Sequence, residues 1–341
     1  MRLDFPDHPS TDVDPRLEAL PAAAAAAADG GVPAAIELAR ELGAWLPAPG
    51  KDTRLRWEAL ATVAAVDLSV ARVVEPHLDA LAILDEAGLS DEVGAPTWGV
   101  YAAEGPGMRV AAVAGPDGTL LSGAKPWCSL AGSLDRALIT AWVDDSRRGL
   151  LALDLRHPGV RALDEPWVGL GLREVTSGPI ELDAVPAQEV GGPGWYLERD
   201  GFAWGGIGVA AAWFGGAVGV ARRMFEQVAH RAPDQIALAH LGAVDARLAA
   251  AAALLGRTAD QVDGGSLAGD AAGLAALRVR QVVADAVDDV LTRAAHSLGP
   301  APLAKEHEHA RRVADLQLYV RQHHAERDAA ALGAQLVRDV T

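Results

Sequence analysis

The sequence LLSGAKPWCSLAGSLDRALITAWV, residues 120–143, decides the fold of this chain. It predicts two β-strands, because two apolar runs are separated by a short polar segment rich in small residues. Gly123 and Pro126 interrupt the first strand, and Pro126 favours an edge or a bulge because proline cannot donate a ladder hydrogen bond.

The residues after Pro126 have the side chains of a ligand site. Because successive side chains of a strand point to opposite faces, Trp127 and Ser129 are expected on one face and Cys128 on the other. An indole beside a hydroxyl offers a flat heteroaromatic cofactor a stacking surface and one hydrogen bond. A buried Trp with a hydrogen-bonded Ser explains the same pattern without any ligand.

Helical patterns precede this stretch. Apolar residues recur at helical spacing, for example at Trp57, Leu60 and Ala64. No strand-type alternation occurs before residue 96, so residues 1–95 are predicted to form a helical N-terminal domain. Short apolar runs with Gly and Pro turns between them predict a small β-barrel or sandwich over residues 96–190.

Long helical patterns return from residue 195 onward. The predicted helices cover residues 202–231, 234–256 with a continuation to 262, 271–297 and 304–332. Long helices with short connections are typical of a four-helix bundle, so residues 195–341 are predicted to form one. The expected fold class is α+β, mainly α.

These motifs resemble the acyl-CoA dehydrogenase family. GAKPWCSLA, from residue 123, matches that family's pattern of G-x-K-x-W, a small residue, Ser or Thr, any residue and Ala. PGV at 158–160, GLR at 171–173 and SGPIELDAVP at 177–186 continue the match. The resemblance covers residues 42–333. It implies a helical N-terminal domain, here shortened, then a small β-barrel and a C-terminal four-helix bundle.

The resemblance also implies an FAD site. Trp127 would cover the flavin, and the hydroxyl of Ser129 would reach flavin N5. In the loop that passes under the flavin, Glu104 matches the family acid and Ala103 replaces a flavin-binding Thr. Tyr101 is the candidate substitute for that Thr, through its hydroxyl or by packing.

Two further positions concern FAD. Arg231 lines up with the family Arg that contacts the FAD of a neighbouring subunit, although a solvated helix-end charge explains this Arg equally well. Gln322 falls where a Thr usually touches the flavin. Because the family packs through the bundle, the resemblance implies a homodimer or homotetramer.

The family's catalytic carboxylate is missing. In the common subgroup its position falls on Val320, and in another subgroup the carboxylate and an adjacent Arg fall on Gly205 and Gly206. Two glycines are expected to leave open space. His323 and His324 stand nearby, and because imidazole transfers protons near neutral pH they are the candidate catalytic residues. A charged helix face is the alternative explanation.

Three functions follow from these observations. The first is an FAD-dependent oxidoreductase that dehydrogenates an acyl thioester or related carbonyl substrate with a non-standard base. The second is a flavin-dependent monooxygenase on the same fold, which requires a redox partner. The third is a catalytically silent family member that acts as a binding or partner subunit.

Composition limits the partners and the location. The net charge of −16 disfavours a nucleic-acid surface. Cys128 is the only cysteine and the N-terminus lacks a signal-peptide pattern, so a cytoplasmic location is expected. Residues 202–221 are uncharged but rich in Gly and Ala, which favours a bundle helix over a membrane span. Only one Glu-x-x-His motif occurs, at 306–309, so no metal is expected.

Overall fold

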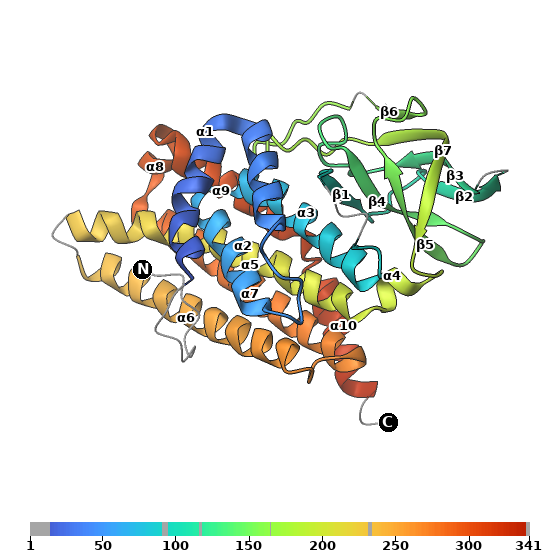
Figure 1. The fold of residues 1–341 in the computed structure, drawn as a ribbon. Coiled ribbons are helices and arrows are strands. Elements are labelled where there is room, and N and C mark those ends of the chain that lie inside the picture. Colours follow the sequence, from blue (N-terminus) through green and yellow to red (C-terminus); the bar gives the residue numbers. More distant parts are fainter. Residues whose placement is uncertain (1–13, 91–94, 116–117, 164, 231–233, 339–341) are drawn as a thin grey trace.

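The computed structural model describes residues 14–338, apart from 91–94, 116–117, 164 and 231–233. Helices from both ends of the chain pack together, and the barrel lies beside them (Figure 1). The helices before the barrel are α1 (Pro15–Gly43), α2 (Thr53–Val66) and α3 (Leu68–Glu86). The helical N-terminal region is therefore confirmed.

Local sequence explains how these helices begin and bend. The backbone of α1 leaves the helical region at Gly31, where φ is 68°, a value that glycine adopts without a Cβ penalty. Asp67 separates α2 from α3, because its side chain accepts a hydrogen bond from the Val70 N–H and so caps the start of α3.

The β-region is a closed barrel. Its strands are β1 (Trp98–Tyr101), β2 (Val110–Gly115), β3 (Gly118–Lys125), β4 (Arg136–Trp142), β5 (Arg148–Asp154), β6 (Val160–Ala162) and β7 (Ile180–Val190). The pairing runs β4-β2-β3-β7-β5 and returns from β5 to β4, while β1 adds to β4 and β6 adds to β7. The two strands predicted within residues 120–143 are β3 and β4. β3 is paired on both sides, and its irregularity lies between Leu121 and Gly123.

The alternation expected for Trp127, Cys128 and Ser129 is wrong. β3 ends at Lys125, and the chain then turns, with positive φ at Trp127 (59°) and Leu130 (55°). Cys128 and Ser129 are both buried, whereas Trp127 is 58% exposed. A turn has no two-residue side-chain period, so these adjacent side chains do not alternate between faces as they would in a strand.

The helices after the barrel form the C-terminal bundle. They are α4 (Trp195–Glu198), α5 (Asp200–His230), α6 (Gln235–Asp263), α7 (Gly269–Leu298), α8 (Pro300–Lys305), α9 (His307–Tyr319), η2 (Val320–Gln322) and α10 (Glu326–Arg338). α5 packs against α7, α6, α9 and also α2. The mainly helical fold with a small barrel and a C-terminal bundle is therefore confirmed.

The single helix predicted over residues 304–332 is wrong. The backbone breaks at Glu306 and again after Tyr319, where a 3-10 turn leads to His323 in an extended conformation. His323 and His324 therefore lie in the bend between η2 and α10, and the interpretation as a continuous charged helix face does not apply to them.

Three of the described helices, α1, α5 and α6, are long and apolar enough to cross a membrane by length and composition. The apolar window of α5 is 72% buried inside the protein, and α5 lies in the interior of the bundle. Its glycines permit this packing, because a Cβ added at Gly215 would lie 2.1 Å from the Ala61 carbonyl oxygen of α2.

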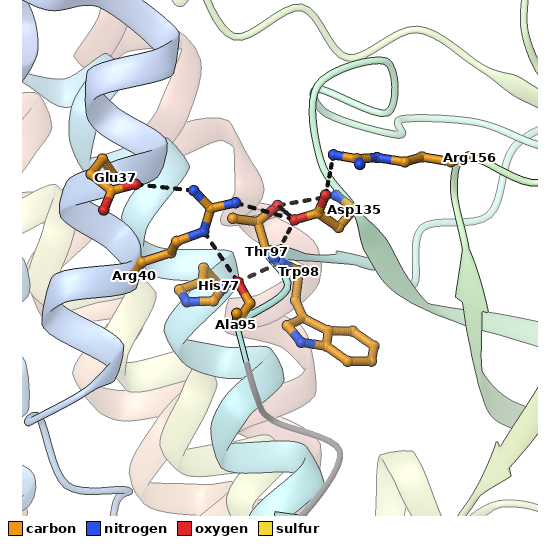
Figure 2. A network of polar contacts seen from close by, with 8 residues as sticks. All are labelled: Glu37, Arg40, His77, Ala95, Thr97, Trp98, Asp135 and Arg156. Carbon is orange, nitrogen blue, oxygen red and sulfur yellow. Dashed lines mark hydrogen bonds and ion pairs between the residues drawn. The ribbon is translucent and has the colours of Figure 1, made fainter.

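A polar cluster holds the barrel to α1 (Figure 2). The Arg40 guanidinium donates to the Ala95 carbonyl at 3.2 Å and to Asp135 at 3.3 Å. The same Asp135 carboxylate accepts the Thr97 N–H and hydroxyl, both at 2.8 Å, and pairs with Arg156. We call Arg40, Thr97, Asp135 and Arg156 the clamp. It holds one end of the contact between the barrel and the helices.

His77 of α3 supports the start of β1 beside the clamp (Figure 2). Its Nδ1 accepts a hydrogen bond from the Trp98 N–H at 3.2 Å. Burial, together with the charges of Arg40 and Arg56, lowers the pKa of His77 to about 4. The imidazole is therefore neutral at physiological pH and serves as a buried acceptor.

Candidate active site

Ser129 lies where the barrel meets α3. Its hydroxyl is 2.6 Å from the Ser177 hydroxyl and accepts a hydrogen bond from Arg72 Nη2 at 3.2 Å. Its carbonyl accepts the Tyr101 hydroxyl at 2.9 Å. The loop that carries the exposed Trp127 indole is therefore tied to the barrel through Tyr101 and to the helices through Arg72.

Charged residues continue this contact into the helical interior. Arg72 and Glu75 lie one turn apart on α3, with Arg72 Nη1 3.6 Å from Glu75 Oε2. The Tyr319 hydroxyl, from the end of α9, donates to Glu75 Oε2 at 3.3 Å. We call Ser129, Arg72, Glu75 and Tyr319 the polar seam.

Glu75 is the buried carboxyl group of this seam. The residue is 9% exposed, and burial raises its pKa to about 7 although the Arg72 charge opposes the shift. A carboxyl group that titrates near neutrality, held between a guanidinium and a phenol, is suited to accept and return a proton.

The open space expected at Gly205 and Gly206 is filled by side chains of neighbouring helices. A Cβ added at Gly205 would lie 2.7 Å from Asp79 Oδ1 of α3. Arg280 of α7 lies beside Gly206 and donates to its carbonyl at 2.9 Å. Burial raises the pKa of Asp79, against the charge of Arg199. A carboxyl group of α3 and a guanidinium of α7 thus lie in this region.

The two predicted catalytic histidines occupy different environments. His323 is buried, with its ring centroid 6.4 Å from that of Trp213 and its Nε2 3.7 Å from Asp328 Oδ2. Burial lowers the pKa of His323, although the Asp328 carboxylate opposes the shift. His324 is exposed, and its Nδ1 is 3.3 Å from Asp328 Oδ1. Their roles stay predictions, and His323 alone of the two reaches the interior.

The remaining predicted residues are dispersed. Glu104 pairs with the buried Lys125 at 2.6 Å, which makes it the counter-ion of a buried ammonium. Ala103 and Gln322 are exposed, and the Gln322 carbonyl accepts a hydrogen bond from Arg280 at 2.8 Å. Arg231 lies outside the described residues.

The sequence carried a signal for the groups that its motifs missed. Arg72, Glu75 and Asp79 recur at helical spacing within the apolar segment of residues 68–86. Charges on the same face as apolar residues are buried only when they are paired, so this spacing indicates a buried ionic cluster.

Little free volume remains within the seam. A cavity of about 10 Å³, lined by Arg72, Tyr101 and Ser129 among others, gives roughly the space for one water molecule. Across the described ranges, no group of three or more His, Cys, Asp or Glu side chains is placed to hold a metal ion.

Neither a model of a known protein family nor a curated protein matches this sequence. Solved structures match over almost the whole chain. KijD3, in complex with FMN and dTDP-3-amino-2,3,6-trideoxy-4-keto-3-methyl-D-glucose, has a TM-score of 0.78 and 21% identity, covering 96% of this chain and 92% of its own. TdsC of Paenibacillus sp. A11-2, a dibenzothiophene monooxygenase, in complex with FMN and indole, has a TM-score of 0.80 and 18% identity, covering 96% and 98%.

Butyryl-CoA dehydrogenase from Megasphaera elsdenii has a TM-score of 0.81 and 17% identity, covering 96% of this chain and 100% of its own. The likeness to these proteins establishes the acyl-CoA dehydrogenase-like fold. The resemblance read from the motifs at 123–131, 158–160, 171–173 and 177–186 is thereby confirmed at the level of the fold.

Proposed function

We propose that this protein is a flavin-dependent oxidoreductase whose reaction takes place where Trp127 meets the polar seam. The observation that carries the proposal is the exposed Trp127 indole beside the buried Ser129 hydroxyl, which the Arg72 guanidinium already contacts. The acyl-CoA dehydrogenase-like fold supports it, as do KijD3 and TdsC, whose structures hold FMN.

The residues present fit a flavin ring. The indole offers an apolar stacking face, and the Ser129 hydroxyl offers one hydrogen bond. Arg72 Nη1 is buried without a hydrogen-bond partner among the residues that the structure describes. An unsatisfied buried donor costs about 1–3 kcal/mol, which the nitrogen and oxygen acceptors of a ring edge would recover.

The charged interior favours a compact polar substrate over a long acyl chain. Arg72 and Glu75 belong to the seam, and Asp79 and Arg280 lie near it, so a hydrocarbon tail would have to pack against buried polar groups. Such contact is unfavourable, because apolar groups do not replace the hydrogen bonds that charged groups make in water. We therefore propose a small substrate that carries polar groups, such as a carbonyl compound or an amine.

The chain's own residues supply the proton transfer. A bound flavin supplies the electron exchange. Glu75 accepts the substrate proton, Arg72 holds the carboxylate toward Ser129, and the Tyr319 hydroxyl stabilises the ionised form by its hydrogen bond. His323 is the second candidate acceptor.

Flavin binding tests the proposal. Titration with FAD, which the sequence predicts, and with FMN should give saturable changes in visible absorbance for at least one of them. Ser129→Ala and Trp127→Ala should each weaken binding about tenfold, because each removes one contact to the ring. Ser146→Ala, in an exposed turn, should bind like the wild type. Absence of flavin uptake would support the silent binding subunit instead.

The flavin-loaded protein separates the two redox reactions. Anaerobic mixing with butyryl-CoA bleaches the flavin of a thioester dehydrogenase. An unbleached flavin, together with oxygen consumption only when an external reductase supplies reduced flavin, supports the monooxygenase. The charged interior predicts no bleaching by butyryl-CoA. The homo-oligomeric state and the cytoplasmic location stay predictions.

A further inference from the structure

A second cavity, of about 540 Å³, lies between the C-terminal half of α5, the start of α9 and the junction of α2 with α3. It shares no lining residue with the polar seam. This volume is typical of pockets that bind small molecules.

Ion pairs neutralise part of the cavity wall. Arg223 donates to both oxygens of Glu306, at 2.7 and 2.8 Å. Arg312 donates to Glu308 at 2.8 Å and to the Val66 carbonyl at 3.0 Å. The two carboxylates therefore already have their counter-ions.

Arg222 is left without such a partner. It is half-buried, and within the described part of the chain it makes no hydrogen bond and no ion pair. Burial and the nearby charge of Arg312 lower the pKa of Arg222, whereas Glu226, an exposed residue of the wall, opposes them. Two guanidinium groups thus stand near one another with only one of them paired.

The start of α9 offers backbone N–H donors at the same place, in a first turn that also carries Glu308. This helix has 13 residues, and its first turn receives no side-chain cap from Glu306, its N-cap residue. Free N–H groups and the helix dipole make such an end attractive to anions.

His309 completes the wall with a buried side chain. It is 4% exposed and lines the cavity, and its Nδ1 has no hydrogen-bond partner among the described residues. Burial lowers its pKa, and Arg223 and Arg312 lower it further although Glu306 opposes them. His309 therefore brings a buried imidazole without a hydrogen bond at Nδ1 to the wall of the cavity.

We propose that this cavity binds a phosphate group, held by Arg222, His309 and the first-turn amides of α9. These donors come from α5 and from the start of α9, and a tetrahedral dianion accepts hydrogen bonds from several directions at once. The group belongs either to free phosphate or to a phosphorylated small molecule that fills the rest of the cavity.

Calorimetric titration with inorganic phosphate and with adenosine monophosphate tests this site and needs no flavin. At least one of them should bind saturably, and the tighter one identifies the source of the phosphate. Arg222→Met should weaken binding about tenfold, because it removes the unpaired charge and keeps the side-chain length. Arg222→Lys should retain most of the affinity. Arg278→Met, an exposed site on α7 that does not line the cavity, is the matched control.

Two results would overturn the proposal: neither probe binds, or Arg222→Met leaves the affinity unchanged or lowers it no more than Arg278→Met. If Arg222→Met lowers the melting temperature, His309→Gln provides the same test without changing α5, and an unchanged affinity in that variant also counts against the site.

Discussion

At the scale of one residue, the protonation of Glu75 makes the stability of the fold depend on pH. Burial raises its pKa from 4.5 to about 7. Because the folded pKa lies above the unfolded one, the folded state binds more protons between these values. The stability that protonated Glu75 contributes is therefore complete below pH 4.5 and is lost as the pH rises through 7. This shift corresponds to about 3 kcal/mol.

Glu75→Gln should remove this pH dependence. At pH 8 the free energy of unfolding of the variant should exceed that of the wild type by up to about 3 kcal/mol, because the amide places no negative charge in the interior. At pH 5 the two proteins should differ little. Urea unfolding at both pH values measures this, with Glu165→Gln at an exposed site as the control. A difference that is the same at both pH values would contradict the raised pKa.

Asp79 shows why single positions of a family pattern do not decide chemistry. At Gly205 the chain has no side chain, yet Asp79 Oδ1 lies 2.7 Å from where a Cβ would stand. A carboxyl group from another helix lies at this position, and only the packing of α3 on α5 reveals it.

At the scale of the element, the contact between α5 and α2 depends on glycine. Gly215 should not tolerate a methyl group, since its Cβ would lie 2.1 Å from the Ala61 carbonyl, which is backbone and cannot rotate away. Gly215→Ala should destabilise the protein by about 3 kcal/mol.

Gly242→Ala is the matched comparison, because it makes the same substitution in α6 where no atom lies within 4 Å. Here the higher helix propensity of Ala should stabilise the protein by up to about 1 kcal/mol. Thermal unfolding should show a lower melting temperature for Gly215→Ala and a higher one for Gly242→Ala than for the wild type. Equal effects would show that close helix contact does not explain the glycines of α5.

The bend between α9 and α10 is the element that sequence patterns could not predict. Apolar spacing continues across residues 304–332, with no Pro and with only Gly333 beyond it. The break arises because His323 packs against Trp213 of α5 and Arg280 of α7 binds the Gln322 carbonyl. Long-range contacts override local helix propensity here.

At the scale of the whole molecule, the clamp determines how the barrel sits on the helices. Asp135 connects Arg40 of α1, Thr97 before β1 and Arg156 after β5. Although burial alone would raise the pKa of Asp135, hydrogen bonds from Thr97 and the charges of Arg156 and Arg40 lower it.

Asp135→Ala should loosen this junction. The change leaves two guanidinium groups and two Thr97 donors without their acceptor, which should cost about 2 kcal/mol. Hydrogen exchange should increase in β1 and at the start of β4 more than in α5. Asp144→Ala, which removes a carboxylate bound only within its own turn, should leave exchange in β1 unchanged. A uniform increase would indicate global destabilisation instead.

The sequence alone determined that helices come first, then a β-barrel and then a helical bundle, and it singled out the segment that contains Trp127 and Ser129. It could do so because helix and strand periods, turn residues and short motifs are local properties. The barrel closure, the exposure of Trp127 and the convergence of Arg72, Glu75 and Tyr319 were decided by the tertiary structure. Those groups come from a helix before the barrel and a helix end more than 200 residues later. They meet only after packing removes them from water, and the same burial sets the pKa of Glu75.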